Sequence, residues 1–239
     1  APAPLSDAER VEPVAPEGAE ALDIPEWLWP EFEASLGATA AAAAQALRSR
    51  APVHVRVNSL RSTVAQAVEA LEADGITTRP HPAATMALEV LEGARRLRNV
   101  AAYQNGLVEL QDAASQAVVE QLPLRDGMKV LDYCAGGGGK ALAMAAAADI
   151  QLFAHDSEPR RMKDLPNRAE RAGAHLRSLE TAALAAKAPF DLVLCDVPCS
   201  GSGSWRRAPE GKWRLTPEGL AQLHQTQAEI LQAAAALVG

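Results

Sequence analysis

The second half of the chain alternates between short apolar runs and longer segments with apolar residues at helical spacing. The apolar runs predict β-strands at 128–134, 150–156, 174–180 and 190–196. The segments between and after them predict helices at 140–148, 158–172 and 217–237. Because strand and helix alternate repeatedly, we expect a parallel sheet with helices on both faces.

The first half of the chain has a different pattern. Residues 53–60 alternate apolar and polar side chains, which predicts a strand, and Ser62 or Thr63 can cap a helix that Gly75 closes. Two further short strands are expected at 76–82 and 84–92. This βαββ pattern predicts a small α+β unit.

A helical region is expected before this unit, from about Leu22 to Pro52. The first 21 residues are rich in proline, alanine and acids, and we expect them to be disordered or loosely attached. They contain neither a basic start nor an apolar core, so they do not resemble a signal peptide.

Composition excludes several classes of protein. Hydrophobic residues make up 48% of the chain and charged residues 22%, as in ordinary soluble proteins. No apolar run approaches the roughly 20 residues of a membrane span. The three cysteines have no paired spacing, so neither a disulfide framework nor a zinc site is expected. We therefore expect a cytoplasmic protein without a metal.

The net charge of −7 argues against a simple nucleic-acid binder. Basic residues nevertheless cluster in three places, and two of these clusters have the composition of a solvated surface. The third interleaves tryptophans with cations, a combination suited to RNA. Its members are Trp205, Arg206, Arg207, Lys212, Trp213 and Arg214.

The strongest single feature is the sequence MKVLDYCAGGGGK at 128–140. A strand, a glycine turn and a helix in succession bring backbone N–H groups and a helix N-terminus up to a ligand. The stretch lacks the spacing of a phosphate loop, because Ala141 follows Lys140. A tight turn without a ligand is the alternative interpretation.

A second stretch, FDLVLCDVPCSGSGS at 190–204, is an apolar strand that ends in an acid, followed by Pro-Cys and a Gly/Ser loop. Together, DYCAGGGGK and DVPCSGSG resemble motifs of the Fmu/Sun-type RNA (cytosine-5)-methyltransferases, the RsmB family. Their usual forms are D-x-C-A-A-P-G-G-K and D-x-P-C-S-G-x-G. Gly136 and Gly137 replace the Ala-Pro pair of the first motif. The resemblance extends over most of the chain from about Leu22.

The resemblance implies a fold class: a Rossmann-like methyltransferase domain that uses S-adenosylmethionine (SAM), preceded by a small RRM-like α+β domain. We expect residues 22–102 to form the helical lead-in and the small domain, and residues 103–239 to form the N-terminal part of the methyltransferase domain. The chain ends after the fourth expected strand, before the Thr-Cys segment that the family carries. The expectation is therefore a fragment with an incomplete sheet, inactive by itself and monomeric.

Candidate cofactor ligands follow the strands of the second half. Asp156, about 20 residues beyond the glycine turn, is placed to bind the hydroxyls of a ribose. The resemblance adds Arg161, which matches an arginine of the family, and Glu180, which stands where the family has an acid near adenine. The expected cofactor site consists of Cys134, Ala135, Gly136, Gly137, Gly138, Gly139, Lys140, Asp156, Arg161, Glu180 and Asp196.

Methylation of cytosine at carbon 5 requires a thiolate that adds to carbon 6 and an acid at the ring nitrogen. Asp196 suits the acid, and by its chemistry Cys199 is the thiol best placed to be the nucleophile. The resemblance instead implies that Cys199 assists product release. Cys134 and Cys195 are expected to be structural thiols.

Three functions remain open on this evidence. The first is cytosine-5 methylation of RNA, ribosomal in preference to transfer RNA. The second is methylation of another RNA atom or of protein. The third is a module that binds SAM and RNA without turnover.

Overall fold

The computed structural model describes residues 15–239, so the expectation of disorder for residues 1–14 lies outside the described part. Two compact units are present. The larger unit comprises Pro52–Pro198 and Thr226–Gly239, and the smaller one comprises the described residues up to Ala51 together with Cys199–Gln225.

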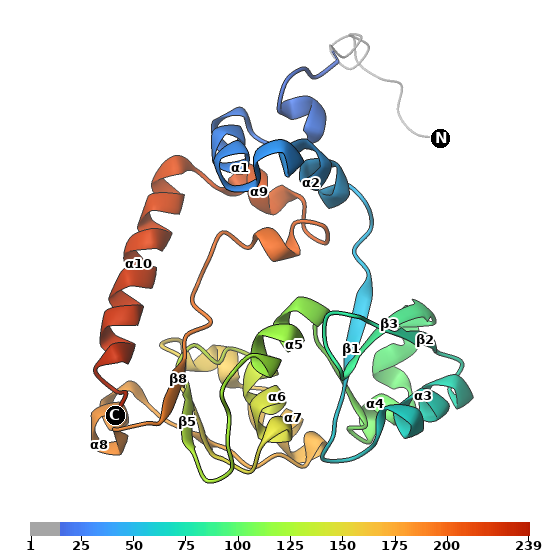
Figure 1. The fold of residues 1–239 in the computed structure, drawn as a ribbon, viewed down its shortest axis with the longest axis vertical. Helices are drawn as coiled ribbons and strands as arrows, with labels where there is room; N and C mark the ends of the chain where they lie inside the picture. Colours follow the sequence, from blue (N-terminus) through green and yellow to red (C-terminus); the bar gives the residue numbers. More distant parts are fainter. Residues whose placement is uncertain (1–14) are drawn as a thin grey trace, which may run out of the picture. The chain divides into compact units, whose positions relative to one another are not determined.

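The first sheet of the larger unit is antiparallel, with the strand order β2-β3-β1-β4. Its strands are β1 (Val53–Val57), β2 (Thr77–Pro80), β3 (Ala87–Glu92) and β4 (Val108–Leu110). Helix α3 (Val64–Ala73) follows β1, and the single-turn helix α4 (Ala101–Gln104) precedes β4 (Figure 1). This βαββαβ arrangement confirms the RRM-like expectation.

Local sequence explains the start of α3. The Thr63 side chain accepts a hydrogen bond from the Gln66 N–H, and the Gln66 side chain accepts one from the Thr63 N–H. This capping box satisfies two of the N–H groups that a helix start leaves without partners. Ala67 and Leu71 are fully buried against Val55 and the rest of the apolar face of the sheet.

The small sheet extends beyond the boundary expected at residue 102. Val108 to Leu110 pair with β1, although this segment was expected to belong to the second domain. A close backbone approach explains the difference: a Cβ on Gly106 would lie 2.0 Å from the Arg171 carbonyl oxygen. The Asn58 amide also donates to the carbonyls of Gly106 and Ala172, at 2.8 Å each. The turn that leads into β4 is therefore packed against the backbone of residues 171–172.

The second sheet is parallel, with the strand order β7-β6-β5-β8. Its strands are β5 (Lys129–Asp132), β6 (Gln151–Ala154), β7 (Arg177–Ser178) and β8 (Leu192–Leu194). Its helices are α5 (Ala113–Glu120), α6 (Gly139–Ala147), α7 (Leu165–Ala172) and α8 (Leu184–Lys187). This is the order of a Rossmann half-sheet with one further strand, so the expected fold class is confirmed.

One helix of this sheet differs from expectation, and one edge of the sheet is partly covered. The helix expected from residue 158 begins later: Pro159–Met162 form a 3-10 turn, and α7 starts at Leu165 with Pro166 in its first turn. Proline is tolerated there because the first N–H groups of a helix have no partner within it. The edge beside β8 is partly covered, because the Phe190 N–H donates to the Leu237 carbonyl at 2.8 Å and Phe190 bridges Val238.

The smaller unit is helical. It contains α1 (Trp29–Leu36), α2 (Ala40–Leu47), α9 (Glu210–Arg214) and the first part of α10 (Pro217–Ala235). Trp205, 2% exposed, packs with Ile24, Leu28 and Ala44. The helical lead-in therefore packs with residues 199–225, whereas it was expected to form one domain with the α+β segment. Ala19 is buried in the same core, so the described end of the expected disordered segment is packed.

This packing corrects part of the expected RNA-binding cluster. Trp205 stacks on Phe32 with ring centroids 6.2 Å apart, and Lys212 is fully buried with its Nζ 2.5 Å from Asp23. Neither side chain is exposed for RNA, because both complete the core of the helical unit. Arg206 donates to Ser49 and to the Arg50 carbonyl within the same unit. Arg207, Trp213 and Arg214 are exposed.

Candidate functional site

The site lies at the carboxyl end of the parallel sheet, where β5 ends at Asp132 and the chain turns into α6. Two glycines make this turn possible. Gly136 has φ +51° and Gly138 has φ +78°, a region that residues with a side chain rarely adopt. A Cβ on Gly138 would also lie 2.1 Å from the Leu165 Cδ1. The sequence departs from the motif at Gly136, where an alanine would be strained in this conformation.

Asp156 lies two residues beyond the end of β6 and is 3% exposed. Its Oδ2 accepts a hydrogen bond from the Gly136 N–H at 2.9 Å and lies 3.2 Å from the Arg161 guanidinium. Its Oδ1 accepts from the Glu158 N–H at 3.0 Å. The structure thus brings together the glycine turn, Asp156 and Arg161, which sequence analysis had proposed for one site.

Side chains outside the two motifs also donate hydrogen bonds to the backbone of the glycine turn. The sequence did not predict these residues. Gln111 donates to the Gly139 carbonyl at 3.2 Å and accepts from the buried Arg56 at 2.8 Å. Arg168 donates to the Gly137 carbonyl and lies 2.8 Å from Glu109, which is 1% exposed. These contacts connect the small sheet to the site. No local signal in the sequence predicts these contacts, because the burial of Arg56 and Glu109 depends on segments far apart in the chain.

Asp132, at the end of β5, is not among the cofactor ligands expected from the sequence. It is 1% exposed, and neither carboxylate oxygen meets full hydrogen-bond geometry in the described part of the chain, although the Ala141 backbone N–H partly stabilises its charge. Burial, and then the negative charge of Asp196, raise the pKa of Asp132 to about 7. A buried carboxylate with incomplete hydrogen bonding at the end of the central strand is suited to a cationic ligand.

Asp196 follows β8, and its carboxylate lies 2.6 Å from the Nζ of Lys140 in the first turn of α6. The Asp196 side chain is 54% exposed and that of Lys140 is 15% exposed. Asp196 is therefore accessible to a substrate from solvent. The Lys140 ammonium group fixes the position of its carboxylate. This pair joins the two sequence motifs directly.

The three thiols differ in environment. Burial, followed by the neighbouring Cys195, raises the pKa of Cys134 to about 11. Burial also raises the pKa of Cys195. Neither thiol is poised to form a thiolate, which agrees with the structural role expected for both. Cys199 is exposed and lies in the segment that belongs to the smaller unit.

Glu180 is exposed just beyond β7, at the same end of the sheet as Asp156. Between them, His155 is 1% exposed, and its ring nitrogens contact the Tyr133 carbonyl at 2.7 Å and the Thr181 hydroxyl at 3.0 Å. These contacts tie the ends of β5 and β6 to the residue after Glu180. Sequence analysis had not proposed His155.

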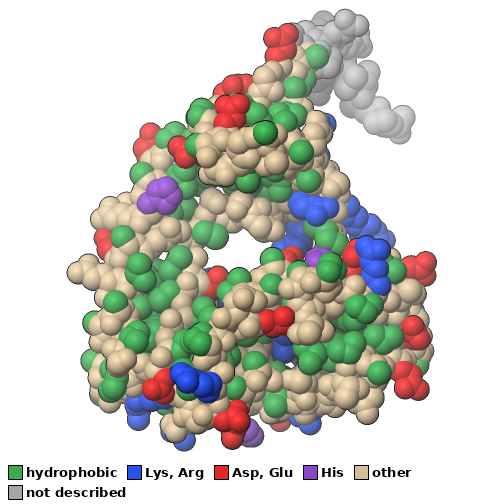
Figure 2. Space-filling view, in the orientation of Figure 1, with side chains coloured by type: hydrophobic (Ala, Val, Ile, Leu, Met, Phe, Trp, Pro, Cys, Tyr) green, Lys and Arg blue, Asp and Glu red, His purple; other side chains and the backbone are tan. Residues whose placement is uncertain are grey.

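These residues fit SAM as a ligand. Asp132 offers a buried carboxylate to a cation, and the left-handed glycines remove side chains from the path of a ligand approaching the turn. Acids lie at or just beyond the carboxyl ends of three neighbouring strands, where ligands of open α/β sheets bind. On the face drawn in Figure 2, acidic side chains are scattered in small groups, so the negative net charge is not gathered in one patch there.

Comparison with known proteins agrees with this geometry. Residues 119–239 match the family model described as 16S rRNA methyltransferase RsmB/F, and residues 24–96 match the ferredoxin-like domain of the same family. A ribosomal RNA small subunit methyltransferase B from Serratia proteamaculans is 29% identical over 87% of the chain and 50% of its own length. The protein of the same name from Vibrio cholerae is 34% identical over 79% of the chain and 45% of its own length.

The crystal structure of the protein PH0851 superposes with a TM-score of 0.86 at 28% identity, covering 96% of the chain and 54% of that protein. The curated relatives that the chain matches are about twice as long, so the chain spans about half of their length. Family models cover β1 to β3 of the small sheet and the segment from the last residues of α5 to residue 239. On this evidence the chain belongs to the RsmB/F family of 16S rRNA methyltransferases.

Proposed function

We propose that this chain binds SAM at the carboxyl end of the parallel sheet, as part of an enzyme that methylates carbon 5 of cytosine in RNA. The observation that carries the proposal is the group formed by the glycine turn, Asp156 and the Lys140–Asp196 pair. Membership of the RsmB/F family supports RNA methylation in general. The motif resemblance supports cytosine and carbon 5.

Each residue has a role in the proposed binding. SAM carries positive charge on its sulfonium and amino groups, and the Asp132 carboxylate would attract that charge. Asp156 would accept hydrogen bonds from the ribose hydroxyls while it keeps the Gly136 N–H in place. Glu180, with its longer side chain, would face the adenine. Residues Cys134 to Gly139 would contact the amino-acid part through their backbone.

The chemistry at the base depends on Asp196. A thiolate that adds to carbon 6 leaves negative charge on the ring, and a proton donor at the ring nitrogen stabilises that charge. Asp196 would occupy this position, oriented by Lys140 at 2.6 Å. Cys199 would act after methyl transfer, when the thiol leaves the ring and the hydrogen on carbon 5 is removed.

The proposed substrate is ribosomal RNA, because the named relatives are ribosomal RNA small subunit methyltransferases. A module that binds SAM and RNA without turnover is the second candidate for the chain by itself. It is favoured by the state of the thiols: burial raises the pKa values of Cys134 and Cys195, so neither is poised as a nucleophile.

The test is calorimetric titration of the 239-residue chain with SAM, followed by an assay of methyl transfer to ribosomal RNA. We expect saturable binding that Asp132→Asn and Asp156→Asn weaken. Glu92→Gln changes an exposed acid of the small sheet and serves as the matched control. Absence of SAM binding by the folded wild-type chain would contradict the proposed function.

A further inference from the structure

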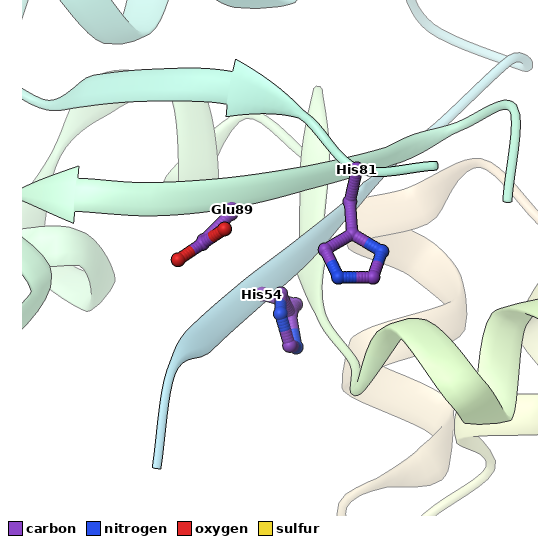
Figure 3. Close-up of side chains that lie close together, drawn as sticks. All are labelled: His54, His81 and Glu89. Carbon is purple, nitrogen blue, oxygen red and sulfur yellow. The ribbon is translucent and has the colours of Figure 1, made fainter. Parts of the chain in front are cut away.

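A group of metal-binding side chains lies on the small sheet, apart from the glycine turn. His54 on β1 and Glu89 on β3 occupy directly opposite positions in the strand register. Opposite residues of an antiparallel pair project from the same face. His81 follows β2, and its ring lies 4.7 Å from the His54 ring, centroid to centroid (Figure 3). One ligand atom from each of the three residues lies within 4.8 Å of the others.

His54 is built into this group. It is 8% exposed, and its Nε2 is buried without a hydrogen-bond partner among the described residues. Leaving a buried polar atom unpaired is costly, so such an atom calls for a ligand.

The other nitrogen of His54 faces the start of α5. Nδ1 accepts a hydrogen bond from the Ala113 N–H at 3.4 Å and lies 3.8 Å from the Asp112 carboxylate. Binding of a metal through Nε2 would move the ring hydrogen to Nδ1, which would then give up the long Ala113 contact and donate to Asp112 instead. A carboxylate behind a histidine ligand is the arrangement that orients such ligands in metal sites.

The contacts that a metal would replace are weak ones. Glu89 pairs with Arg79 at 2.8 Å, but the Arg79 side chain is 62% exposed. Exposed ion pairs of this kind contribute little to stability. His81 is partly buried and accepts from the Ala83 N–H at 3.2 Å, in a loop contact that water can replace. Both ligands are therefore available at small cost.

We propose that His54, His81 and Glu89 bind a divalent transition metal, with Zn²⁺ as the best match. Two imidazole nitrogens and one carboxylate oxygen suit Zn²⁺, and a water would complete a tetrahedral site. This departs from our expectation that the protein holds no metal, which rested on cysteine spacing alone. The bound metal would cross-link β1, β3 and the residue that follows β2.

The test begins with the 239-residue chain freed of metal by a chelator and titrated with Zn²⁺ by calorimetry. We expect binding of one equivalent, and a melting temperature that rises with Zn²⁺ concentration. His81→Ala and Glu89→Gln each remove a partly buried ligand and should leave the fold intact. Each should weaken Zn²⁺ binding by more than the roughly 10–100-fold that loss of a supporting residue causes.

His175→Ala is the matched control, because it removes an exposed histidine of the same unit. Titration with Co²⁺ then identifies the ligands: a nitrogen and oxygen site gives visible bands without the near-ultraviolet absorption of cobalt–thiolate bonds. Wild-type affinity in His81→Ala, or cobalt–thiolate absorption from the cysteines, would overturn the proposal. So would a wild-type chain that binds no stoichiometric Zn²⁺.

Discussion

The Asp156 carboxylate accepts a hydrogen bond of 2.9 Å from the Gly136 backbone N–H, across 20 positions of sequence. The residue proposed to bind a ribose therefore also fixes the turn proposed to receive the rest of the cofactor. Its second oxygen holds the Glu158 N–H at 3.0 Å. Changes at Asp156 should consequently affect both folding and cofactor binding.

We expect Asp156→Ala to weaken SAM binding by roughly 1–3 kcal/mol, because hydrogen-bond partners are left unpaired. The free energy of unfolding should fall by a similar amount, since the Gly136 N–H also loses its acceptor. Calorimetry with SAM and denaturant unfolding of the same samples measure the two effects. If wild type and variant bound SAM equally, the assignment of Asp156 to the ribose would be wrong.

The stability of the protein should depend on the charge state of Asp132. Its pKa is about 7 in the folded protein, against 3.8 in an unfolded chain, so the folded state holds more protons between these values. The free energy of unfolding should therefore fall as the pH rises from about 4 to about 8. Asp132→Asn cannot ionise and should remove this loss, which amounts to a few kcal/mol.

Denaturant titrations of the wild type and of Asp132→Asn across this pH range test the expectation. The exposed Asp149→Asn variant is the matched control. Parallel profiles for the wild type and Asp132→Asn would show that Asp132 does not titrate in this way.

In the smaller unit, the buried Lys212 should contribute to stability and not to RNA binding. Its side chain is 1% exposed and pairs with Asp23, whose side chain is 39% exposed. Asp23→Ala should destabilise the protein by about 2–4 kcal/mol, because it leaves a buried charge without its partner. Lys212→Met, which fills the same space without a charge, should cost much less. Thermal unfolding of both variants measures the two losses of stability. Equal losses would contradict this interpretation of the Lys212–Asp23 pair.

The exposed basic residues of the same segment remain candidates for RNA contact. We expect the double reversal Arg207→Glu with Arg214→Glu to weaken RNA binding and to flatten its salt dependence. The slope should fall by roughly 0.7 for each phosphate that the protein no longer neutralises. Arg95→Glu with Arg98→Glu makes the same change of net charge elsewhere and is the control. Filter binding across a range of salt concentrations measures both slopes. A slope unchanged from the wild type in Arg207→Glu with Arg214→Glu would make the cluster at 205–214 an ordinary solvated surface.

We expect the 239-residue chain to bind SAM without methylating RNA, because none of its three thiols fits the role of nucleophile. Burial raises the pKa values of Cys134 and Cys195, and the motif resemblance assigns Cys199 to product release. The measurement is transfer of a labelled methyl group to ribosomal RNA, followed by a denaturing gel for a protein–RNA adduct. Robust turnover that Cys199→Ala abolishes would make Cys199 the nucleophile.

Local pattern predicted much of the fold. The four apolar runs became β5 to β8, and the Thr63 cap and the glycine turn lie where the sequence placed them. Such features depend on neighbouring residues: side-chain periodicity, capping groups and backbone freedom act within a few positions. Residues 108–110 were expected in the second domain but form β4 of the small sheet. The sequence did not predict this strand, because it forms by pairing with Val55 to Val57.

The sequence by itself determined the class of fold, the family resemblance and the main acids at the strand ends, because these are written in short stretches. Only the tertiary structure decided that Trp205 and Lys212 are core residues of the helical unit. Only the structure showed Asp132 buried with incomplete hydrogen bonding among the described residues, and His54 opposite Glu89 beside His81. Burial and pairing depend on segments far apart in the chain, and no local pattern records which segments meet.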